Sequence, residues 1–239
     1  MLKRFFIAAI ILLAACQSAA PPIVTPTVVP TPSATPLHTG TMPPAPKWME
    51  TQMNGVSLGL WRPAGWAADS SHGLVMAEPT DSTSPNVTGG LLIYCFVPSV
   101  DEFYVSATDV NYAWSVLDQV IRMPSHVGHD VAVSLPVGFD WDQVPAAYYL
   151  LTSGDGMRVL VVAVMVPNVQ KVVVCNMSVP AAQASRIRSS LAPLLNGLTV
   201  NGKVFSGKAL DALPNPLLFP HYSMTSTPVD NRISASSPP

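Results

Sequence analysis

Proline is the residue that most limits where this chain can fold. Nine of its 25 prolines lie in residues 17–46, and six lie in residues 204–239. Because proline lacks an amide N–H and fixes φ, closely spaced prolines prevent regular helices and central strands. We therefore expect one globular domain over residues 47–203, a linker over residues 16–46 and a tail over residues 204–239.

The two proline-rich segments differ in their apolar content. Residues 17–46 contain six threonines and no Asp, Glu, Lys or Arg, which favours an extended and largely disordered linker. As polyproline II at ~3.1 Å per residue, this linker would reach about 90 Å. The tail is expected to be mostly disordered, but Leu217, Leu218, Phe219 and Tyr222 either pack back on the domain or form a short docking segment.

The N-terminus has the pattern of an export signal. Lys3 and Arg4 precede an apolar run from Phe5 to Leu13, and the letters L-A-A-C end at Cys16. The run is too short to cross about 30 Å of hydrocarbon as a helix, so residues 1–15 are interpreted as a cleaved signal peptide. The pattern resembles the lipobox of bacterial lipoproteins, which implies that Cys16 becomes the N-terminus and carries acyl chains such as palmitate. The alternative is an ordinary cleaved signal in which Cys16 has no role.

The expected lipid anchor and the net charge together limit which partners the chain can bind. Two or more acyl chains on Cys16 would hold the chain stably at the extracytoplasmic face of the cell membrane or the outer membrane. The formal net charge is −2, and residues 47–203 carry −4, from 8 Lys or Arg and 12 Asp or Glu. Nucleic acid is not an expected partner, because binding phosphates requires a basic surface. We expect the membrane as a partner through Cys16, together with a protein of the cell envelope.

Apolar segments inside the domain predict strands and two helices. The strands are expected at residues 53–61, 73–78, 91–97, 131–137, 146–152, 158–166, 171–179 and 198–200. Residues 91–97 are apolar at both odd and even positions, which is typical of a strand covered on both faces. One helix should run from a cap at Asp109 to Pro124, and another should start at Pro180 and kink or stop near Ala192, before Pro193. This order predicts an α+β domain in which helices cover an antiparallel sheet.

The domain resembles the PsbP/Mog1 group of α/β/α sandwich domains over most of residues 50–201. The similarity is carried by G-V-S-L-G-L-W-R-P-A-G-W at Gly55–Trp66, the helix around Tyr112–Ile121, R-V-L-V-V-A-V at Arg158–Val164, and L-T-V at Leu198–Val200. Members of this group are mostly accessory proteins that dock on larger assemblies, without a common catalytic constellation. The resemblance therefore implies a binding module and transfers no site residues.

Three groups of residues are candidates for chemistry. Cys95 and Cys175 lie in apolar strands of an exported chain, so they are either a disulfide or two buried thiols. His126, His129 and Asp130 bring three potential metal ligands into one Gly-containing loop, although a polar loop that caps a strand is the simpler interpretation. Asp140 and Asp142 flank Trp141 and would share a face if the strand continued, or would form a solvated turn beside a surface tryptophan.

The sequence contains no Gly-x-Ser-x-Gly, phosphate-loop, His-Glu-x-x-His or Cys-x-x-Cys motif. We therefore expect a non-catalytic binding or accessory module for an envelope assembly, with no metal and no cofactor. Two alternatives remain open: a solute-binding lipoprotein and an envelope hydrolase that uses Asp140 and Asp142.

Overall fold

The computed structural model describes residues 45–79, 90–99, 109–123 and 130–222. The signal peptide, Cys16 and nearly all of the linker lie outside these residues, as do His126, His129 and residues 223–239. The predictions that fall on those segments stay predictions.

A small antiparallel sheet combines the first strands of the domain with the last ones. Its order is β1-β2-β11-β12. The strands are β1 (Lys47–Met53), β2 (Val56–Arg62), β11 (Leu198–Val200) and β12 (Lys203–Phe205). The sequence predicted a single strand over residues 53–61, but the chain turns at Asn54 and Gly55, whose φ angles are +48° and +75°. Asn-Gly accepts the positive φ angles of a two-residue hairpin turn, so the predicted strand starts only at Val56, as β2, and β1 before the turn was not predicted.

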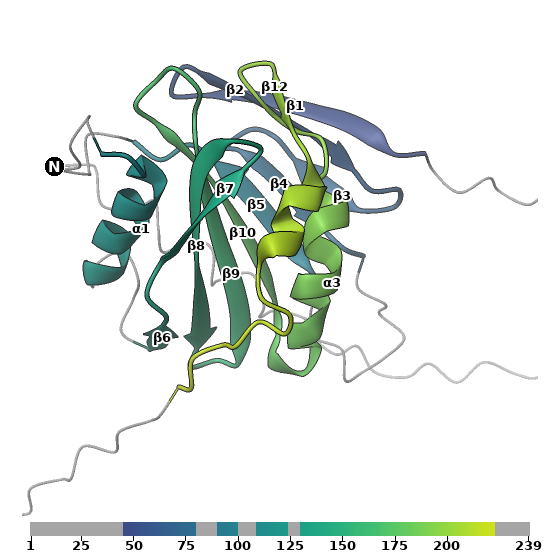
Figure 1. The fold of residues 1–239 in the computed structure, drawn as a ribbon. Coiled ribbons are helices and arrows are strands. Elements are labelled where there is room, and N and C mark those ends of the chain that lie inside the picture. Colours follow the sequence, from purple (N-terminus) through teal and green to yellow (C-terminus); the bar gives the residue numbers. More distant parts are fainter. Residues whose placement is uncertain (1–44, 80–89, 100–108, 124–129, 223–239) are drawn as a thin grey trace, which may run out of the picture. The chain divides into compact units, whose positions relative to one another are not determined.

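The larger sheet is antiparallel in every pairing of the described residues (Figure 1). Its order is β3-β4-β5-β10-β9-β8-β6, and β7 also pairs with β8. The strands are β3 (Ala67–Asp69), β4 (Leu74–Ala77), β5 (Leu92–Phe96), β6 (Val131–Val133), β7 (Val137–Trp141), β8 (Val144–Ser153), β9 (Met157–Met165) and β10 (Val172–Pro180). The strands predicted from the apolar runs are therefore present, and the segment after residue 131 forms two strands instead of one.

The helices begin and end close to the predicted positions. Helix α1 (Tyr112–Arg122) is capped by Asn111, whose side chain accepts a hydrogen bond from the amide of Trp114 at 3.0 Å. Asp109, the predicted cap, instead accepts from the amide of Asn111 at 3.1 Å and from the hydroxyl of Ser115. Helix α3 (Ala184–Leu195) follows a short 3₁₀ segment, η3 (Ala181–Gln183).

Helix α3 does not stop before its proline. Pro193 lies in the last turn, and the helix continues to Leu195 because Leu191 and Leu195 are both fully buried against the core. A proline this close to the C-terminus removes one internal hydrogen bond, and the apolar contacts outweigh that loss. No helix within the described ranges is long and apolar enough to cross a bilayer.

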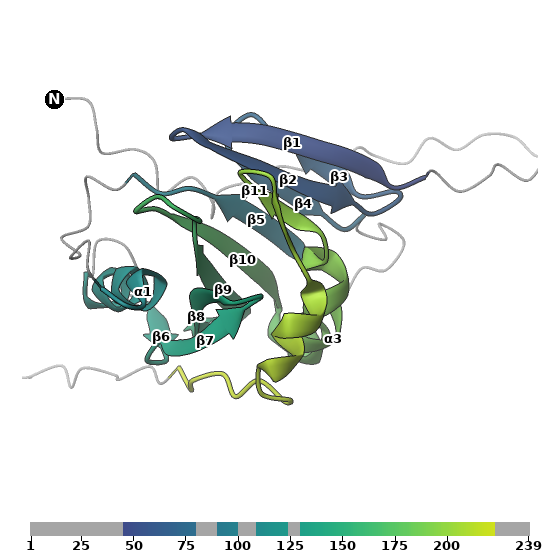
Figure 2. The same ribbon diagram turned by 45° about the horizontal axis from the view of Figure 1, so that its top comes forward.

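The central strands of the large sheet are buried on both faces, and the two faces pack against different elements. Ala147, Val161 and Val174 point to one face, where they pack with α1. The residues of opposite parity form a second cluster with α3, with the 3₁₀ segment η4 (Gly207–Ala212) and with the small sheet. Figure 2 shows α1 and α3 on opposite sides of the large sheet, with the small sheet lying along it. The predicted antiparallel α+β class is confirmed, but helices alone do not cover the sheet.

The domain continues past residue 203, where the sequence placed its end. Phe205 and Leu210 are fully buried, and Leu213 and Leu217 belong to the same core cluster. The guanidinium of Arg188 on α3 donates to the carbonyl oxygens of Asp211, Leu213 and Pro214 at 3.1–3.2 Å. Of the four residues for which the sequence left two possibilities open, Leu217 and Phe219 pack on the core, whereas Leu218 is 78% exposed.

The two neighbouring residues Val204 and Phe205 test this extension of the domain. Phe205 is buried in an edge-to-face contact with Trp141 at 5.3 Å, whereas Val204 is 62% exposed. Phe205→Ala should lower the free energy of unfolding by about 3–5 kcal/mol, because it leaves a cavity in the core. Val204→Ala should change it by less than about 0.5 kcal/mol. Chemical denaturation of both variants measures this, and equal small losses would mean that β12 is not part of the core.

Candidate binding site

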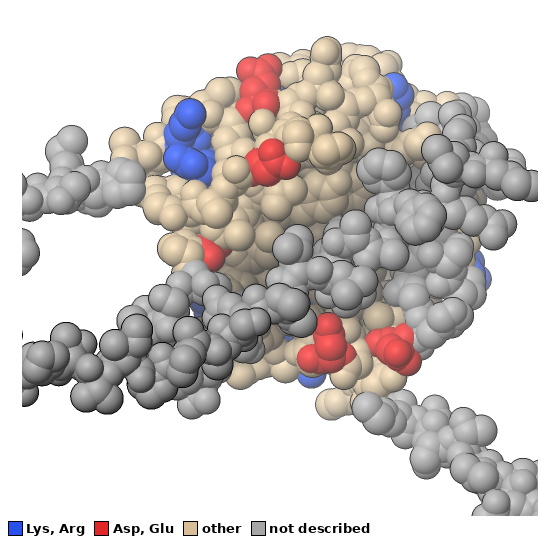
Figure 3. All heavy atoms as spheres, turned by 180° about the vertical axis from the view of Figure 1, so that it is seen from behind, with Lys and Arg blue, Asp and Glu red and all other residues tan. Residues whose placement is uncertain are grey.

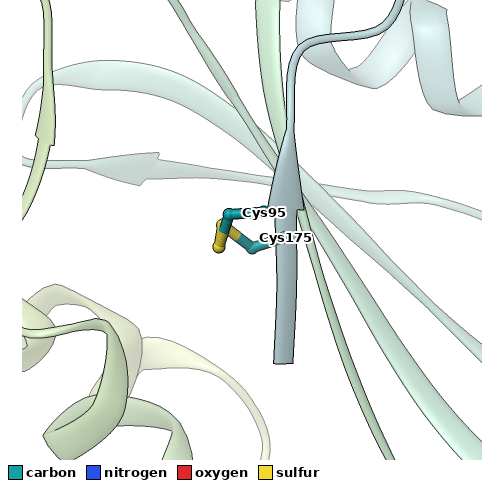
Figure 4. The surroundings of a disulfide bond; sticks show 2 residues. All are labelled: Cys95 and Cys175. Carbon is teal, nitrogen blue, oxygen red and sulfur yellow. A yellow bond between two sulfur atoms is a disulfide. The ribbon is translucent and has the colours of Figure 1, made fainter. Parts of the chain in front are cut away.

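Cys95 and Cys175 lie directly opposite each other on the neighbouring strands β5 and β10. Their Cα atoms are 4.0 Å apart, and their sulfur atoms are joined in a disulfide. Figure 4 shows both side chains leaving the sheet on the same side. Because both residues are buried, the bond is a cross-link inside the core and not an accessible reactive group.

The other candidates from the sequence are placed apart from one another. Asp130 caps a hairpin: its carbonyl accepts from the amide of Gly154 at 2.7 Å, and its carboxylate accepts from the hydroxyl of Tyr222 at 3.3 Å. Its predicted partners His126 and His129 lie outside the described residues. The parts of the chain that the structure describes contain no group of three His, Cys, Asp or Glu placed to hold a metal ion.

Asp140 and Asp142 do not share a strand face. Asp140 is exposed on β7, but Asp142 and Gln143 form the turn into β8 with φ angles of +49° and +65°. The carboxylate of Asp142 accepts from the amide of Ser206, so it fastens the C-terminal segment to this hairpin. Trp141 is 1% exposed, and its indole N–H donates to the carbonyl of Ser206 at 2.8 Å. The expectation of a surface tryptophan at this turn was wrong, because Trp141 is buried by a segment after residue 203 for which the prolines predict a tail.

The exposed aromatic residues of interest lie on the small sheet, where the sequence analysis did not place a site. Trp48 on β1 is directly opposite Trp61 on β2, and their rings meet edge to face at 5.3 Å. Trp61 is 52% exposed. Leu58 and Leu60, at the alternate parity of β2, are fully buried, so the tryptophans lie on the outer face. That parity is the signal in the sequence that could have identified this surface.

Gly59 determines how Trp48 lies. A Cβ atom built on Gly59 would come within 2.2 Å of Cζ2 of Trp48. The indole ring therefore lies flat across the backbone of β2, at a place where any other residue would push it outward. We call Trp48, Gly59 and Trp61 together the tryptophan face.

A polar cleft of about 290 Å³ lies at the start of β1, where Lys47 pairs with Arg62 at the parity opposite to that of Trp48 and Trp61. It is lined by Lys47, Trp48, Met49, Glu50, Arg62, Ala68, Asp69 and Ser70. Among the ion pairs of the described residues, none involves its four charged side chains, Lys47, Arg62, Glu50 and Asp69. The Nε of Arg62 is buried without a hydrogen-bond partner in the structure.

Serine side chains hold the two carboxylates of this cleft. Asp69 accepts from the hydroxyl of Ser71 at 2.6 Å and from its amide at 3.2 Å, and these bonds lower the pKa of Asp69. Glu50 accepts from the hydroxyl of Ser57 at 3.2 Å. The cleft therefore presents oriented acceptors beside two cations, which is a set of groups that can bind a polar ligand.

A second cavity, of about 410 Å³, lies between the β7–β8 and β9–β10 turns and the start of α1. Its lining contains no charged residue and includes Gln143, Asn168, Gln170, Met165 and Tyr112. Burial raises the pKa of Tyr112. This cavity lies within the size range of small-molecule sites, and its lining suits a neutral ligand.

Comparison with known proteins gives similarities of fold only. No protein-family model matches the chain, and no curated protein matches it. The chain is similar to the solution structure of cyanobacterial PsbP from Synechocystis sp. PCC 6803, with 15% identity, a TM-score of 0.43, and coverage of 70% of this chain and 98% of that one. It is also similar to the Ran-binding protein Mog1p of Saccharomyces cerevisiae, with 12% identity, a TM-score of 0.37, and coverage of 61% and 82%.

The cross-link between β5 and β10 should contribute to stability. It closes a loop over a sequence separation of 80 residues, so reduction should cost about 2–5 kcal/mol. Denaturation of the wild type with and without reductant measures this loss. The Cys95→Ala/Cys175→Ala variant is the control, because reductant should not change its stability. If alkylation under denaturing, non-reducing conditions labels both thiols of the wild-type domain, the disulfide does not form.

A second stability test concerns the ion pair between Glu78 and Arg186, which joins the end of β4 to α3 at 2.7 Å. The hydrogen bond from Arg186 holds the pKa of Glu78 below its ordinary value of 4.5. A lowered folded-state pKa stabilises the protein above the unfolded value, and this stability is lost as the pH falls through the folded value.

Glu78→Gln should therefore destabilise the protein at pH 7, by less than about 1 kcal/mol because the pair is partly exposed. The difference from wild type should shrink as the pH falls below 4.5. Urea denaturation of both proteins between pH 7 and pH 3 measures it. A difference that stays constant over this range would show that the pair does not depend on the charge of Glu78.

Proposed function

We propose that this chain is a lipid-anchored extracytoplasmic lipoprotein whose domain is a non-catalytic binding or accessory module for an envelope assembly. The observation that carries the proposal is the sequence around Cys16: two cations, an apolar run and L-A-A-C. A proline-rich linker follows, and the first strand of the domain starts at Lys47. An anchor, a spacer and a folded module in this order suit a domain that works at a distance from the bilayer.

The proposal extends to the class of the domain, which we take to be a PsbP/Mog1-like α/β/α sandwich. Its support is the order of the elements: a hairpin, an antiparallel sheet interrupted by α1, and a closing helix followed by a short strand. Proteins of this group act mainly by docking on larger assemblies, so a protein of the cell envelope is the partner we propose.

The arrangement of acidic side chains supports a module without catalysis. Glu78 pairs with Arg186, Asp118 pairs with Arg122, and Asp142 holds the amide of Ser206. These carboxylates make structural contacts, which fits a rigid domain that binds through its surface. On the face turned away from Figure 1, the visible described residues are mostly uncharged, with separate groups of Lys, Arg, Asp and Glu side chains between them (Figure 3). Weakly charged surfaces of this kind are less costly to desolvate on docking.

The two alternatives differ in their structural support. A solute-binding lipoprotein is favoured by the uncharged cavity beside Tyr112, whose volume of about 410 Å³ suits a small neutral ligand. Native mass spectrometry of the purified protein would detect such a ligand. A hydrolase that uses Asp140 and Asp142 would lose its activity in an Asp140→Asn/Asp142→Asn variant, and a measured activity with this behaviour would replace the proposal.

Acylation of Cys16 can be tested in cells fed with an alkyne-labelled fatty acid. The wild type should incorporate the label and partition into the detergent phase of a Triton X-114 extraction, because acyl chains add about 0.8 kcal/mol per buried methylene. Cys16→Ala should remain unlabelled and aqueous. The Cys95→Ala/Cys175→Ala variant is the matched control and should keep the label. An unlabelled wild type would remove the anchor from the proposal.

A further inference from the structure

We propose that the tryptophan face binds a proline-rich segment of the chain's own linker, residues 26–36, in the polyproline II conformation. The contact joins the domain to the segment that precedes it, so it does not depend on acylation of Cys16. In an anchored chain, docking would shorten the tether between the membrane and the domain, and release would lengthen it.

The tryptophan face lies on a sheet surface that is almost uncharged. The strand register places the residues of outer parity together: Trp48, Glu50, Gln52, Ser57, Gly59, Trp61, Thr199 and Val204. Glu50 is the only charged residue in this set, and its carboxylate accepts from the hydroxyl of Ser57. Trp61 is 52% exposed, and Val204 is 62% exposed. Exposed apolar side chains with so little charge around them favour an uncharged and partly apolar occupant.

The two tryptophans of this face also have unused hydrogen-bond donors. The indole N–H of Trp114 donates to the carbonyl of Pro136 at 3.0 Å, and that of Trp141 donates to the carbonyl of Ser206. Among the hydrogen bonds of the described residues, none involves the indole N–H of Trp48 or Trp61, which contact each other through their rings. The face therefore offers flat apolar rings together with donors that lack an acceptor.

Polyproline II is the backbone conformation that matches these groups. It has no internal hydrogen bonds, so its carbonyl groups are exposed and can accept from an indole N–H. Its proline rings are apolar, and grooves lined by aromatic side chains bind them in several classes of peptide-recognition domain. Because the conformation exists before binding, docking costs less ordering entropy than the docking of a flexible peptide.

The chain supplies a segment of this kind directly before the domain. Residues 17–46 contain nine prolines and no Asp, Glu, Lys or Arg, and they end two residues before Trp48. Pro26, Val29 and Pro32 are spaced three residues apart, so they lie along one edge of a polyproline II helix. Covalent linkage gives a nearby segment an effective concentration in the millimolar range, which no free partner of the same chemistry has.

The length of the linker allows residues 26–36 to lie back on the face. Residues 37–42 contain no proline, and Gly40 among them accepts a tight turn. Pro32 and Trp48 are each eight residues from Gly40, so a chain reversal there brings Pro32 level with Trp48. At ~3.1 Å per residue the segment covers about 34 Å, whereas the seven residues of β1 extend over about 24 Å. The segment can therefore span both rings.

The test uses the full chain with Cys16→Ser and a nitroxide spin label on Ser33→Cys, inside the docking segment. The five tryptophans give five indole N–H signals in a ¹⁵N NMR spectrum, which Trp→Phe variants assign. We expect the signals of Trp48 and Trp61 to lose most of their intensity through the nearby unpaired electron. The signal of Trp114 should keep its intensity, because α1 packs on the other face of the large sheet.

A variant without prolines in the docking segment tests the cause of this loss: Pro26→Ser/Pro30→Ser/Pro32→Ser/Pro36→Ser. It keeps the linker uncharged and equally long, and the signals of Trp48 and Trp61 should recover most of their intensity. The matched control is Pro228→Ser/Pro238→Ser, which removes prolines from the tail and should leave the loss unchanged. All six substitutions lie outside the described residues, so the fold of the domain should not change.

Gly59→Ala tests the domain side of the contact. It removes no contact group, but the new methyl displaces the ring of Trp48, so the signal of Trp61 should recover intensity. Thermal unfolding shows whether this variant is folded. An unchanged loss at Trp61 in the folded variant would overturn the proposal.

Three further results would also overturn it: no loss at Trp48 and Trp61 in the spin-labelled parent, an equal loss in the linker variant and the parent, or an equal loss at Trp114. A mixture of ¹⁵N-labelled chain without nitroxide and nitroxide-labelled chain without ¹⁵N distinguishes the source of the segment. Loss of the Trp61 signal in this mixture would show that another copy supplies the segment and that the chain's own linker is not the occupant.

Discussion

The rest of the structure depends on the burial of strands β8, β9 and β10 on both faces. Adjacent residues of these strands belong to different clusters: Val161 packs with α1, whereas Val162 packs in the main core. Each face must exclude water separately, because a strand that is apolar at both parities gains stability only when both sides are covered. Helix α1 packs against one side of the central strands. The other side is larger, and α3 alone does not cover it, so the small sheet and the segment after residue 203 complete the cover.

This second layer explains why the tryptophan face lies where it does. The small sheet contributes Leu58 and Leu60 to the core, and the alternate residues of the same strand must then point outward. Trp61 on this outer face is exposed and is not among the residues of the core cluster. Lys47 pairs with Arg62 and Trp48 pairs with Trp61, so the two cations and the two aromatic rings leave the hairpin on opposite faces.

Sequence patterns predicted the elements whose signal is local, and they failed where the signal is long-range. The apolar runs located β5, β8, β9 and β10, and the spacing of apolar residues located both helices. The end of the domain was missed because prolines in residues 204–239 resemble a tail, while Phe205 and Leu210 find their partners on α3 and β7 through tertiary packing. The tryptophan face was missed for a related reason. The alternation over residues 53–61 predicted a strand that runs through the Asn54-Gly55 turn, so it did not predict the pairing of Trp48 with Trp61.

The tryptophan face is an open surface and not an enclosed pocket. Trp61 is 52% exposed, and Trp48 lies across the backbone of β2 at Gly59. A surface of this shape buries little of a partner in each contact, so an isolated contact would be weak. If the domain is tethered as we propose, the linker would make a second contact intramolecular, with an effective concentration in the millimolar range, and weak contacts would then suffice.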